Sequence, residues 1–257
     1  MAKQTAKKTT SKSKSIVITG ASDGIGKALA WEMASRGYNL GLTARRGALL
    51  EALKAEIQTK YPAIKIVVEV LDVTDFGEVP KALSRVHESL GVIDILVVNA
   101  GIARAGRVVN TPIEDQLAVI NTNLNGAIAT VTAGLVLFRQ QGAGHIVATS
   151  SVAGYRGLPR NAAYSASKAG LSTFMESVRL ETRKENIDVT VINPGFIDTA
   201  INRGMASRPF VISVEKGARL FADLIEKKVT VSSVPKMPWN LLAPLLRILP
   251  DSIIAKM

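Results

Sequence analysis

The sequence predicts one α/β domain, in which a doubly wound parallel sheet is covered by helices on both faces. Short, continuously apolar strands alternate with longer helical segments, as in parallel sheets that are buried on both sides. A glycine-rich turn joins the first strand to the first helix, which is a common opening for such a sheet. The chain of 257 residues is 47% hydrophobic, enough for the core of one large domain.

The expected strands are short runs rich in apolar residues. The first, at 15–19, leads straight into the glycine-rich turn, and the helix after it ends at Gly37, a typical helix stop. Each later strand is followed by a helical segment, until a last clear strand at 188–192. The expected strands are 15–19, 39–43, 64–70, 93–98, 145–149 and 188–192, and the expected helices are 27–36, 48–60, 79–90, 116–138 and 164–185.

The net charge of +11 is unevenly placed, because residues 1–14 hold five lysines and no acid. This stretch has no apolar run, so we expect a disordered tail, and it lacks the apolar centre of a secretory signal. A solubilising tail is favoured over an anchor to anionic lipid or nucleic acid, since no aromatic residues interleave with the lysines. The catalytic domain is then 15–257, and the expected location is cytoplasmic.

The composition argues against metal and thiol chemistry. Without cysteine there is no disulfide framework and no thiolate metal site. The two histidines are His87, on an expected exposed helix, and His145, at the start of an expected strand. Lone histidines of this kind are interpreted as structural, so no metal site is expected.

Tyr164 and Lys168 are four residues apart in an expected helix, a spacing that puts two side chains on one face. A lysine beside a tyrosine favours the phenolate, so the pKa of the phenol is expected to fall from about 10. Such a tyrosine can give or take a proton near neutral pH. Ser151 stands thirteen residues earlier. Its neighbour Ser150 points to the opposite face of an extended segment, so only one of the two is expected at this site.

Gly20, Gly24 and Gly26 follow the spacing G-x-x-x-G-x-G between an apolar strand and a helix. Glycines let the backbone approach a pyrophosphate, and the helix N-terminus supplies free N–H groups and a favourable dipole. The spacing differs from the G-x-G-x-x-G fingerprint of many dinucleotide sites. Because the strand precedes it and the helix follows it, the turn is interpreted as a phosphate cradle.

Taken together, these motifs resemble those of the short-chain dehydrogenase/reductase family, over about residues 15–200. The resemblance implies an NAD(P)-dependent oxidoreductase on a Rossmann fold. Two positions depart from the family pattern: Val98, which is often asparagine, and Asp23, where some NADP-using members have a basic residue. The residues that carry the resemblance are Thr19 to Gly26, Asn99-Ala100-Gly101, Asn123, Ser151, Tyr164 with Lys168, and Pro194-Gly195.

By this resemblance, Tyr164 is the proton donor, Ser151 orients the substrate oxygen, and Lys168 binds the nicotinamide ribose. The cofactor residues that the resemblance implies are Gly20, Ser22, Asp23, Gly24, Ile25, Gly26, Asp72, Val73, Asn99, Ala100, Gly101, Tyr164, Lys168, Pro194, Gly195, Ile197 and Thr199.

Asn123 resembles the family's helix asparagine, which holds a water in the proton relay. Asn121 and Asn125 are rival candidates nearby. Only Asn123 has the N-x-x-G spacing to Gly126, so it completes the expected catalytic set.

The dinucleotide expected is NADP(H). In NAD-binding members an acid at the end of the second strand binds the ribose 2′-hydroxyl, and that place is Ala44 here. Arg45 and Arg46 follow, and an arginine can clamp a 2′-phosphate with paired hydrogen bonds. The open alternative is that both arginines are solvated residues at a helix start, with Asp23 weakening any phosphate site.

Residues 200–213 are expected to form the variable loop over the active site, where such scaffolds carry specificity. Phe196, Ile201, Met205 and Phe210 suggest an apolar pocket for a lipophilic ketone or secondary alcohol. The alternative is that these side chains only pack the loop.

The apolar segment 235–257 is too short and too broken by proline to span a bilayer. Three interpretations remain: packing on its own domain, burial against another subunit, or contact with a membrane surface beside Lys236 and Arg247. Packing or subunit contact is favoured, and a homo-oligomer, dimer or tetramer, is expected.

The sequence therefore predicts an NADP(H)-dependent oxidoreductase that acts on a small carbonyl or alcohol. A catalytically silent dinucleotide-binding protein, regulatory or structural, is the alternative. The four expected catalytic residues argue against it, because a binding module needs no acid. Nucleic-acid binding is not expected, since the tail has no reading element.

Overall fold

Seven parallel strands form one sheet in the computed structural model, which describes residues 13–205 and 207–255. The strands are β1 (Ser15–Thr19), β2 (Asn39–Ala44), β3 (Ile66–Val70), β4 (Ile95–Val98), β5 (Gly144–Thr149), β6 (Ile187–Pro194) and β7 (Val231–Val234). Their order across the sheet is β3-β2-β1-β4-β5-β6-β7. The predicted fold class is confirmed, while the predicted tail lies outside the described residues except for Ser13 and Lys14.

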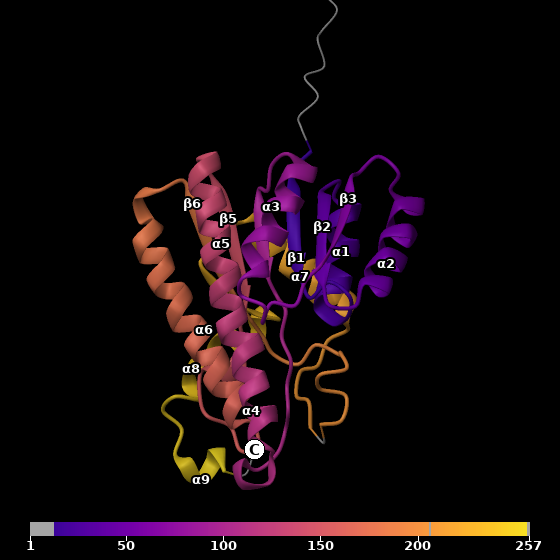
Figure 1. Ribbon diagram of the computed structural model, residues 1–257. Coiled ribbons are helices and arrows are strands. Elements are labelled where there is room, and N and C mark those ends of the chain that lie inside the picture. The colour runs from indigo at the N-terminus through magenta and orange to yellow at the C-terminus, as the bar shows by residue number, and fades with distance from the viewer. Residues whose placement is uncertain (1–12, 206, 256–257) are drawn as a thin grey trace, which may run out of the picture.

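Helices cover both faces of this sheet (Figure 1). They are α1 (Gly24–Ser35), α2 (Gly47–Lys60), α3 (Glu78–Leu90), α4 (Ile113–Ile120), α5 (Gly126–Gln141), α6 (Ala162–Glu181), α7 (Val214–Glu226), α8 (Lys236–Leu245) and α9 (Asp251–Ile254). One apolar core joins the sheet to α1, α2 and α7, and the other joins it to α3, α5 and α6. In β1, Ile16 and Ile18 face the first core and Val17 the second, as the alternation of a strand requires.

The strand order reverses at β1, which lies between β2 and β4. After β3 the chain returns to the other side of β1 and continues outward from β4 to β7. The carboxyl ends of β1 and β4 therefore diverge into loops that leave a crevice, the usual ligand site of an open α/β sheet.

Two of the predicted helices differ from the observed ones, one in its first residue and the other in being interrupted. The first begins at Gly24 rather than residue 27, because the Asp23 carboxylate caps it by accepting from the Gly24 N–H at 2.7 Å. The helix expected over 116–138 is instead α4 and α5, which are joined by a π-helical turn at Asn121–Asn125. Four elements beyond residue 200 were not predicted: α7, β7, α8 and α9. None of the described helices is long and apolar enough to cross a bilayer.

His145 makes stability depend on pH in the acid range. Its side chain is buried in the sheet, with Nε2 2.8 Å from Thr190 Oγ1, and burial lowers the pKa of the imidazole from 6.5 to about 4. Between these values the unfolded chain binds a proton that the folded chain does not, so stability falls as the pH drops. We expect His145 to cost about 3 kcal/mol of unfolding free energy between pH 7 and pH 4.

Urea unfolding across this pH range measures that loss, and His145→Gln should flatten the slope by the same amount. His87→Gln is the matched control, because His87 lies partly exposed on α3. Equal slopes for the parent and His145→Gln would contradict the prediction.

Candidate active site and dinucleotide pocket

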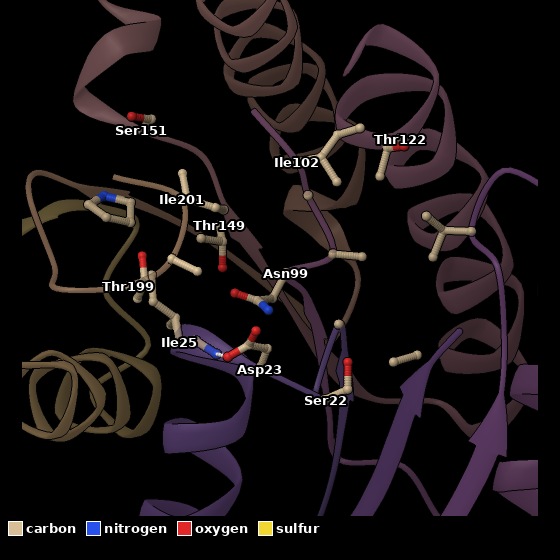
Figure 2. Close-up of a pocket in the computed structure, with 18 of the residues that line it drawn as sticks. Ser22, Asp23, Ile25, Asn99, Ile102, Thr122, Thr149, Ser151, Thr199 and Ile201 are labelled. Atoms are coloured by element: carbon tan, nitrogen blue, oxygen red, sulfur yellow. Dashed lines mark hydrogen bonds between the residues drawn. The ribbon is translucent and has the colours of Figure 1, made fainter. Parts of the chain in front are cut away.

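A cavity of about 460 Å³ lies at the carboxyl ends of the strands, in the crevice between β1 and β4. Figure 2 shows the side chains that converge on it from the glycine-rich turn, the loop after β4 and the loop after β6. The predicted residues that line it are Gly20, Ser22, Asp23, Gly24, Ile25, Arg45, Arg46, Asp72, Val73, Asn99, Ala100, Gly101, Ser151, Tyr164, Lys168, Pro194, Gly195, Ile197 and Thr199. Of the predicted cofactor and catalytic residues, only Gly26 and Asn123 lie outside this lining.

The glycine-rich turn has no room for a side chain at two of its glycines. Gly20 has a φ of +69°, and a Cβ there would lie 2.8 Å from the Ala100 Cα. A Cβ at Gly26 would lie 2.4 Å from the Gly20 carbonyl oxygen, so this glycine lets the helix start close against the turn. The result is a cradle of bare backbone at the N-terminus of α1, suited to an anion.

Thr19 ties the ends of β1 and β4 together beneath the cavity. Its hydroxyl accepts from the backbone N–H groups of Asn99 at 2.9 Å and Ala100 at 3.1 Å, and donates to the Val97 carbonyl. The Asn99 side-chain amide donates to the Thr19 carbonyl at 3.0 Å, and Figure 2 shows this amide at the centre of the site. The floor of the cavity is thus fixed by hydrogen bonds between its two central strands.

Two exposed arginines stand at one end of the cavity. Arg46 donates to the Ser22 hydroxyl at 3.0 Å and lies 3.4 Å from the Asp23 carboxylate. Arg45 lies 3.8 Å from Asp72 at the same end. Arg45, Arg46 and Ser22 all line the cavity, so two arginines, each close to an aspartate, stand beside the phosphate cradle.

Tyr164 and Lys168 share one face of α6, as their spacing predicts. The Lys168 Nζ lies 5.9 Å from the centre of the Tyr164 ring and donates to the Thr149 carbonyl at 2.7 Å. The Lys168 side chain is only 4% exposed, so the ammonium group is held between α6 and the end of β5. The two side chains are therefore neighbours at the cavity wall.

The predicted direction of the Tyr164 pKa is wrong. Burial raises the pKa of the phenol, and a hydrogen bond with Ser151 opposes this without reversing it. Burial also lowers the pKa of Lys168 from 10.5 to about 8. Desolvation therefore outweighs the attraction between ammonium and phenolate, and the phenol is protonated at neutral pH.

The structure separates the two neighbouring serines. The Ser150 hydroxyl donates to the Lys168 carbonyl at 2.9 Å and lies 2.7 Å from the Ser172 hydroxyl, so it anchors α6. The Ser151 hydroxyl accepts from the Ala153 N–H at 3.1 Å, and Ser151 lines the cavity together with Tyr164.

Asn123 is fully buried in the π-helical turn and its side chain does not reach the cavity. Its side-chain amide makes two hydrogen bonds with the Ile102 backbone: the amide oxygen accepts from the N–H at 2.8 Å, and the amide nitrogen donates to the carbonyl at 2.9 Å. It also donates to the Ser167 hydroxyl. Asn121 and Asn125 bond to each other instead, so only Asn123 fastens the loop after β4 to α6.

The aromatic side chains expected around the substrate pack elsewhere. Phe196 and Phe210 lie 6.1 Å and 5.9 Å, centre to centre, from the Trp239 ring of α8. Of the four predicted pocket side chains only Ile201 lines the cavity. The packing alternative therefore holds for both phenylalanines.

The C-terminal segment packs on its own domain through one face. Trp239 is buried and covers Gly195, where a Cβ would lie 2.2 Å from the indole Nε1. Ala243 is buried in the same cluster with Val152. The opposite face of α8 remains exposed, with Leu241 and Leu245 among its side chains.

Several lining residues were not singled out from the sequence, and Thr149 is the most informative. Its hydroxyl is buried at the cavity and has no partner among the described residues. The segment Thr149-Ser150-Ser151 could have suggested it, as three consecutive hydroxyls at a strand end. The other missed residues are Leu71, Ile102, Arg104, Thr122, Ala200 and Asn202. Ala44 and Ser150, which the sequence analysis named without placing them in the site, also line the cavity.

Comparison with known proteins agrees with this geometry. Residues 14–209 match the short chain dehydrogenase family. An uncharacterised oxidoreductase of Mycobacterium tuberculosis is 40% identical over 239 residues, which cover 93% of this chain and 94% of that protein. A 3-oxoacyl-[acyl-carrier-protein] reductase of Rattus norvegicus is 33% identical, over 86% of this chain and 91% of its own.

Among solved structures, an alcohol dehydrogenase of the archaeon Thermococcus sibiricus, complexed with 5-hydroxy-NADP, superposes with a TM-score of 0.78. It is 27% identical and the match covers 86% of this chain and 95% of that one. The family match and the relatives indicate the same family, and Ser151, Tyr164 and Lys168 lie together in one cavity. The chain belongs to the short-chain dehydrogenase family of oxidoreductases.

Proposed function

We propose that the protein is an NADP(H)-dependent oxidoreductase that interconverts a ketone and a secondary alcohol. The observation that carries the proposal is a single cavity with an anion cradle at one end and the hydroxyls of Ser151 and Tyr164 at the other. A dinucleotide in this cavity brings its nicotinamide end beside those hydroxyls when its pyrophosphate lies on the glycine-rich turn. The proposed catalytic set is Asn123, Ser151, Tyr164 and Lys168.

The residues present fit the dinucleotide. The pyrophosphate would lie on the bare backbone from Gly20 to Gly26, and Asp72 and Val73 would border the adenine. Lys168 and the Asn99-Ala100-Gly101 segment would contact the riboses, and the loop from Pro194 to Thr199 the carboxamide. When bound, the nicotinamide supplies the hydride for carbonyl reduction or accepts one from the alcohol.

The protein's own groups handle the proton. Ser151 would donate a hydrogen bond to the substrate oxygen, and Tyr164 would give that oxygen its proton. Because burial raises its pKa, Tyr164 carries its proton at neutral pH, which favours carbonyl reduction. Asn123 would act as a positioning residue, because its hydrogen bonds hold the loop after β4 against α6, the helix that carries Tyr164 and Lys168.

A lipophilic substrate is supported by Ile102 and Ile201, which line the cavity near the catalytic hydroxyls. The rat relative is called a reductase of 3-oxoacyl groups and the archaeal neighbour an alcohol dehydrogenase, so both names belong to carbonyl and alcohol chemistry. Assembly into a homo-oligomer stays a prediction.

Mixing the purified protein and NADPH with a panel of ketones, while absorbance at the nicotinamide band is followed, tests the proposal directly. Good turnover of sugars with none of hydrophobic ketones would refute the substrate class.

The choice of NADP(H) rests on Arg45, Arg46 and Ser22, with the NADP derivative bound by the archaeal neighbour in support. We expect the double variant Arg45→Gln/Arg46→Gln to raise the KM for NADPH by about 10–100-fold, because charge-assisted bonds to a 2′-phosphate are lost. The KM for NADH should change little.

Arg179→Gln, on the far half of α6, is the matched control and should leave both constants unchanged. A parent protein with a lower KM for NADH than for NADPH would overturn the choice of cofactor. So would an equal loss of both cofactors in the double variant.

A further inference from the structure

The exposed apolar side chains of the described chain are concentrated at one end of the molecule. Most belong to three segments, 107–117, 201–211 without residue 206, and 236–253, which we call the mouth surface. Val109 is 89% exposed and Ile248 is 77% exposed, so most of the surface of these two apolar residues is in contact with solvent. Figure 1 shows α4, α8 and α9 at this end, opposite the end where β1 begins.

Contacts join the three segments into one surface. Phe210 of the second segment packs edge-to-face on Trp239 of the third. The loop 155–160 links the third segment to the first, because Arg156 donates to the Arg247 carbonyl at 3.0 Å and the Arg160 carbonyl accepts from Gly106 at 2.8 Å. The apolar side chains are therefore parts of a continuous face rather than scattered singly, and such faces mark interaction sites.

The mouth surface borders the opening of the active-site cavity. Ile201 of the second segment lines the cavity, and so does Arg104, close to the first segment. A partner that covers this face would therefore lie directly over the substrate entrance.

Basic side chains are interspersed with the apolar ones and outnumber the acids. The basic residues on these segments and the loop 155–160 include four without a salt bridge to any described residue: Arg107, Arg160, Lys236 and Arg247. Of the four acids nearby, Asp115, Asp198 and Asp251 are each paired with an arginine, and Glu114 alone has no salt bridge to a described residue, so the unpaired basic residues exceed the unpaired acids by three. The face thus combines exposed apolar groups with uncompensated positive charge.

This combination favours an anionic lipid surface over a second copy of the chain. A symmetric dimer would bury this patch against its own copy, so its excess positive charge would meet an equal excess. A membrane interface instead takes the apolar side chains into the acyl boundary and places anionic headgroups beside the basic ones. The short helices α8 and α9 can lie on such a surface, and neither is long enough to cross it.

We propose that the mouth surface docks the protein on anionic membranes, with the cavity opening towards the lipid. The proposal concerns binding and stands apart from turnover. It departs from the expectation from sequence, which favoured packing or subunit contact over a membrane surface, because internal packing accounts for only one face of α8.

Co-sedimentation with vesicles of phosphatidylcholine and phosphatidylserine, compared with pure phosphatidylcholine, tests the docking. We expect the full chain to partition onto the anionic vesicles. The double variant Leu241→Gln/Ile248→Gln should lower the partition constant by about tenfold or more, since two inserted apolar side chains are lost. Arg107→Gln/Lys236→Gln should lower it roughly fivefold per charge.

The matched control is Val136→Gln/Leu180→Gln, which replaces two exposed apolar side chains on α5 and α6 at the other end of the molecule. It should bind like the parent, and circular dichroism should give all variants the parent's fold. Binding that is unchanged in Leu241→Gln/Ile248→Gln and abolished by salt would assign it to the basic N-terminal residues and overturn the proposal. A changed mass by light scattering with no vesicle binding would make this face a contact between copies, and would overturn it too.

Discussion

Replacing Tyr164 with phenylalanine is expected to lower kcat by about 10²–10⁴-fold, the contribution of a positioned general acid. Phenylalanine keeps the ring against Lys168 and loses only the phenolic hydroxyl. The Kd for NADPH, measured by calorimetry, should stay within a factor of about two because no phosphate contact changes. Steady-state turnover of a ketone found in the panel gives kcat.

Tyr155→Phe is the matched control. Its hydroxyl accepts a long hydrogen bond of 3.4 Å from Asn193 and does not line the cavity, so its kcat should be close to that of the parent. Equal activity of Tyr164→Phe and the parent would discard the mechanism. It would leave a dinucleotide-binding protein whose chemistry, if any, is elsewhere.

Replacing Lys168 with methionine is expected to abolish most activity and to raise the unfolding free energy by about 2 kcal/mol at pH 7. The lowered pKa of Lys168 means that its buried charge costs about 3 kcal/mol. Loss of the hydrogen bond to the Thr149 carbonyl destabilises the variant by about 1 kcal/mol, which leaves a net stabilisation of about 2 kcal/mol. The active site would thus be more stable without the group that it needs.

The pH dependence of the gain identifies its cause. Below pH 8 the folded and unfolded chains both carry the proton on Lys168, so the full cost is present. Between pH 8 and 10.5 only the unfolded chain carries it, so the parent recovers stability and the gain disappears as the pH rises. Urea unfolding at pH 7 and pH 10 measures both ends, with Lys81→Met on the exposed side of α3 as control. A Lys168→Met variant less stable than the parent at pH 7 would contradict this account.

The sequence was sufficient for the sheet from β1 to β6, because each of these strands is a short run dominated by apolar residues. It was insufficient for β7, since Val231-Ser232-Ser233-Val234 is short and half polar. The helix α7 could have been found, because Ala218, Phe221, Ala222 and Ile225 repeat at helical spacing on its buried face. The break between α4 and α5 could not, as the π-helical turn at Asn121–Asn125 contains no proline or glycine and the Gly126 after it has helical dihedral angles.

The residues of the proposed cofactor end were predictable from sequence, and those of the proposed substrate end were not. Glycines, arginines and the Tyr164–Lys168 pair carry local signals, and the cavity lining contains them. The pKa of Tyr164 depends on burial by elements distant in sequence, which a local spacing does not reveal. The fate of Phe196 and Phe210 depended likewise on Trp239, a residue of a helix that was not expected.

Trp239 has a consequence for studying the protein. The chain has two tryptophans, and this one lies against Gly195, on the loop that borders the cavity, while Trp31 is on α1 beside Tyr61. A Trp31→Phe background would leave a single tryptophan, next to that loop, which can be excited selectively at the red edge of its absorption band. Its emission would give an optical titration of dinucleotide binding without any attached dye.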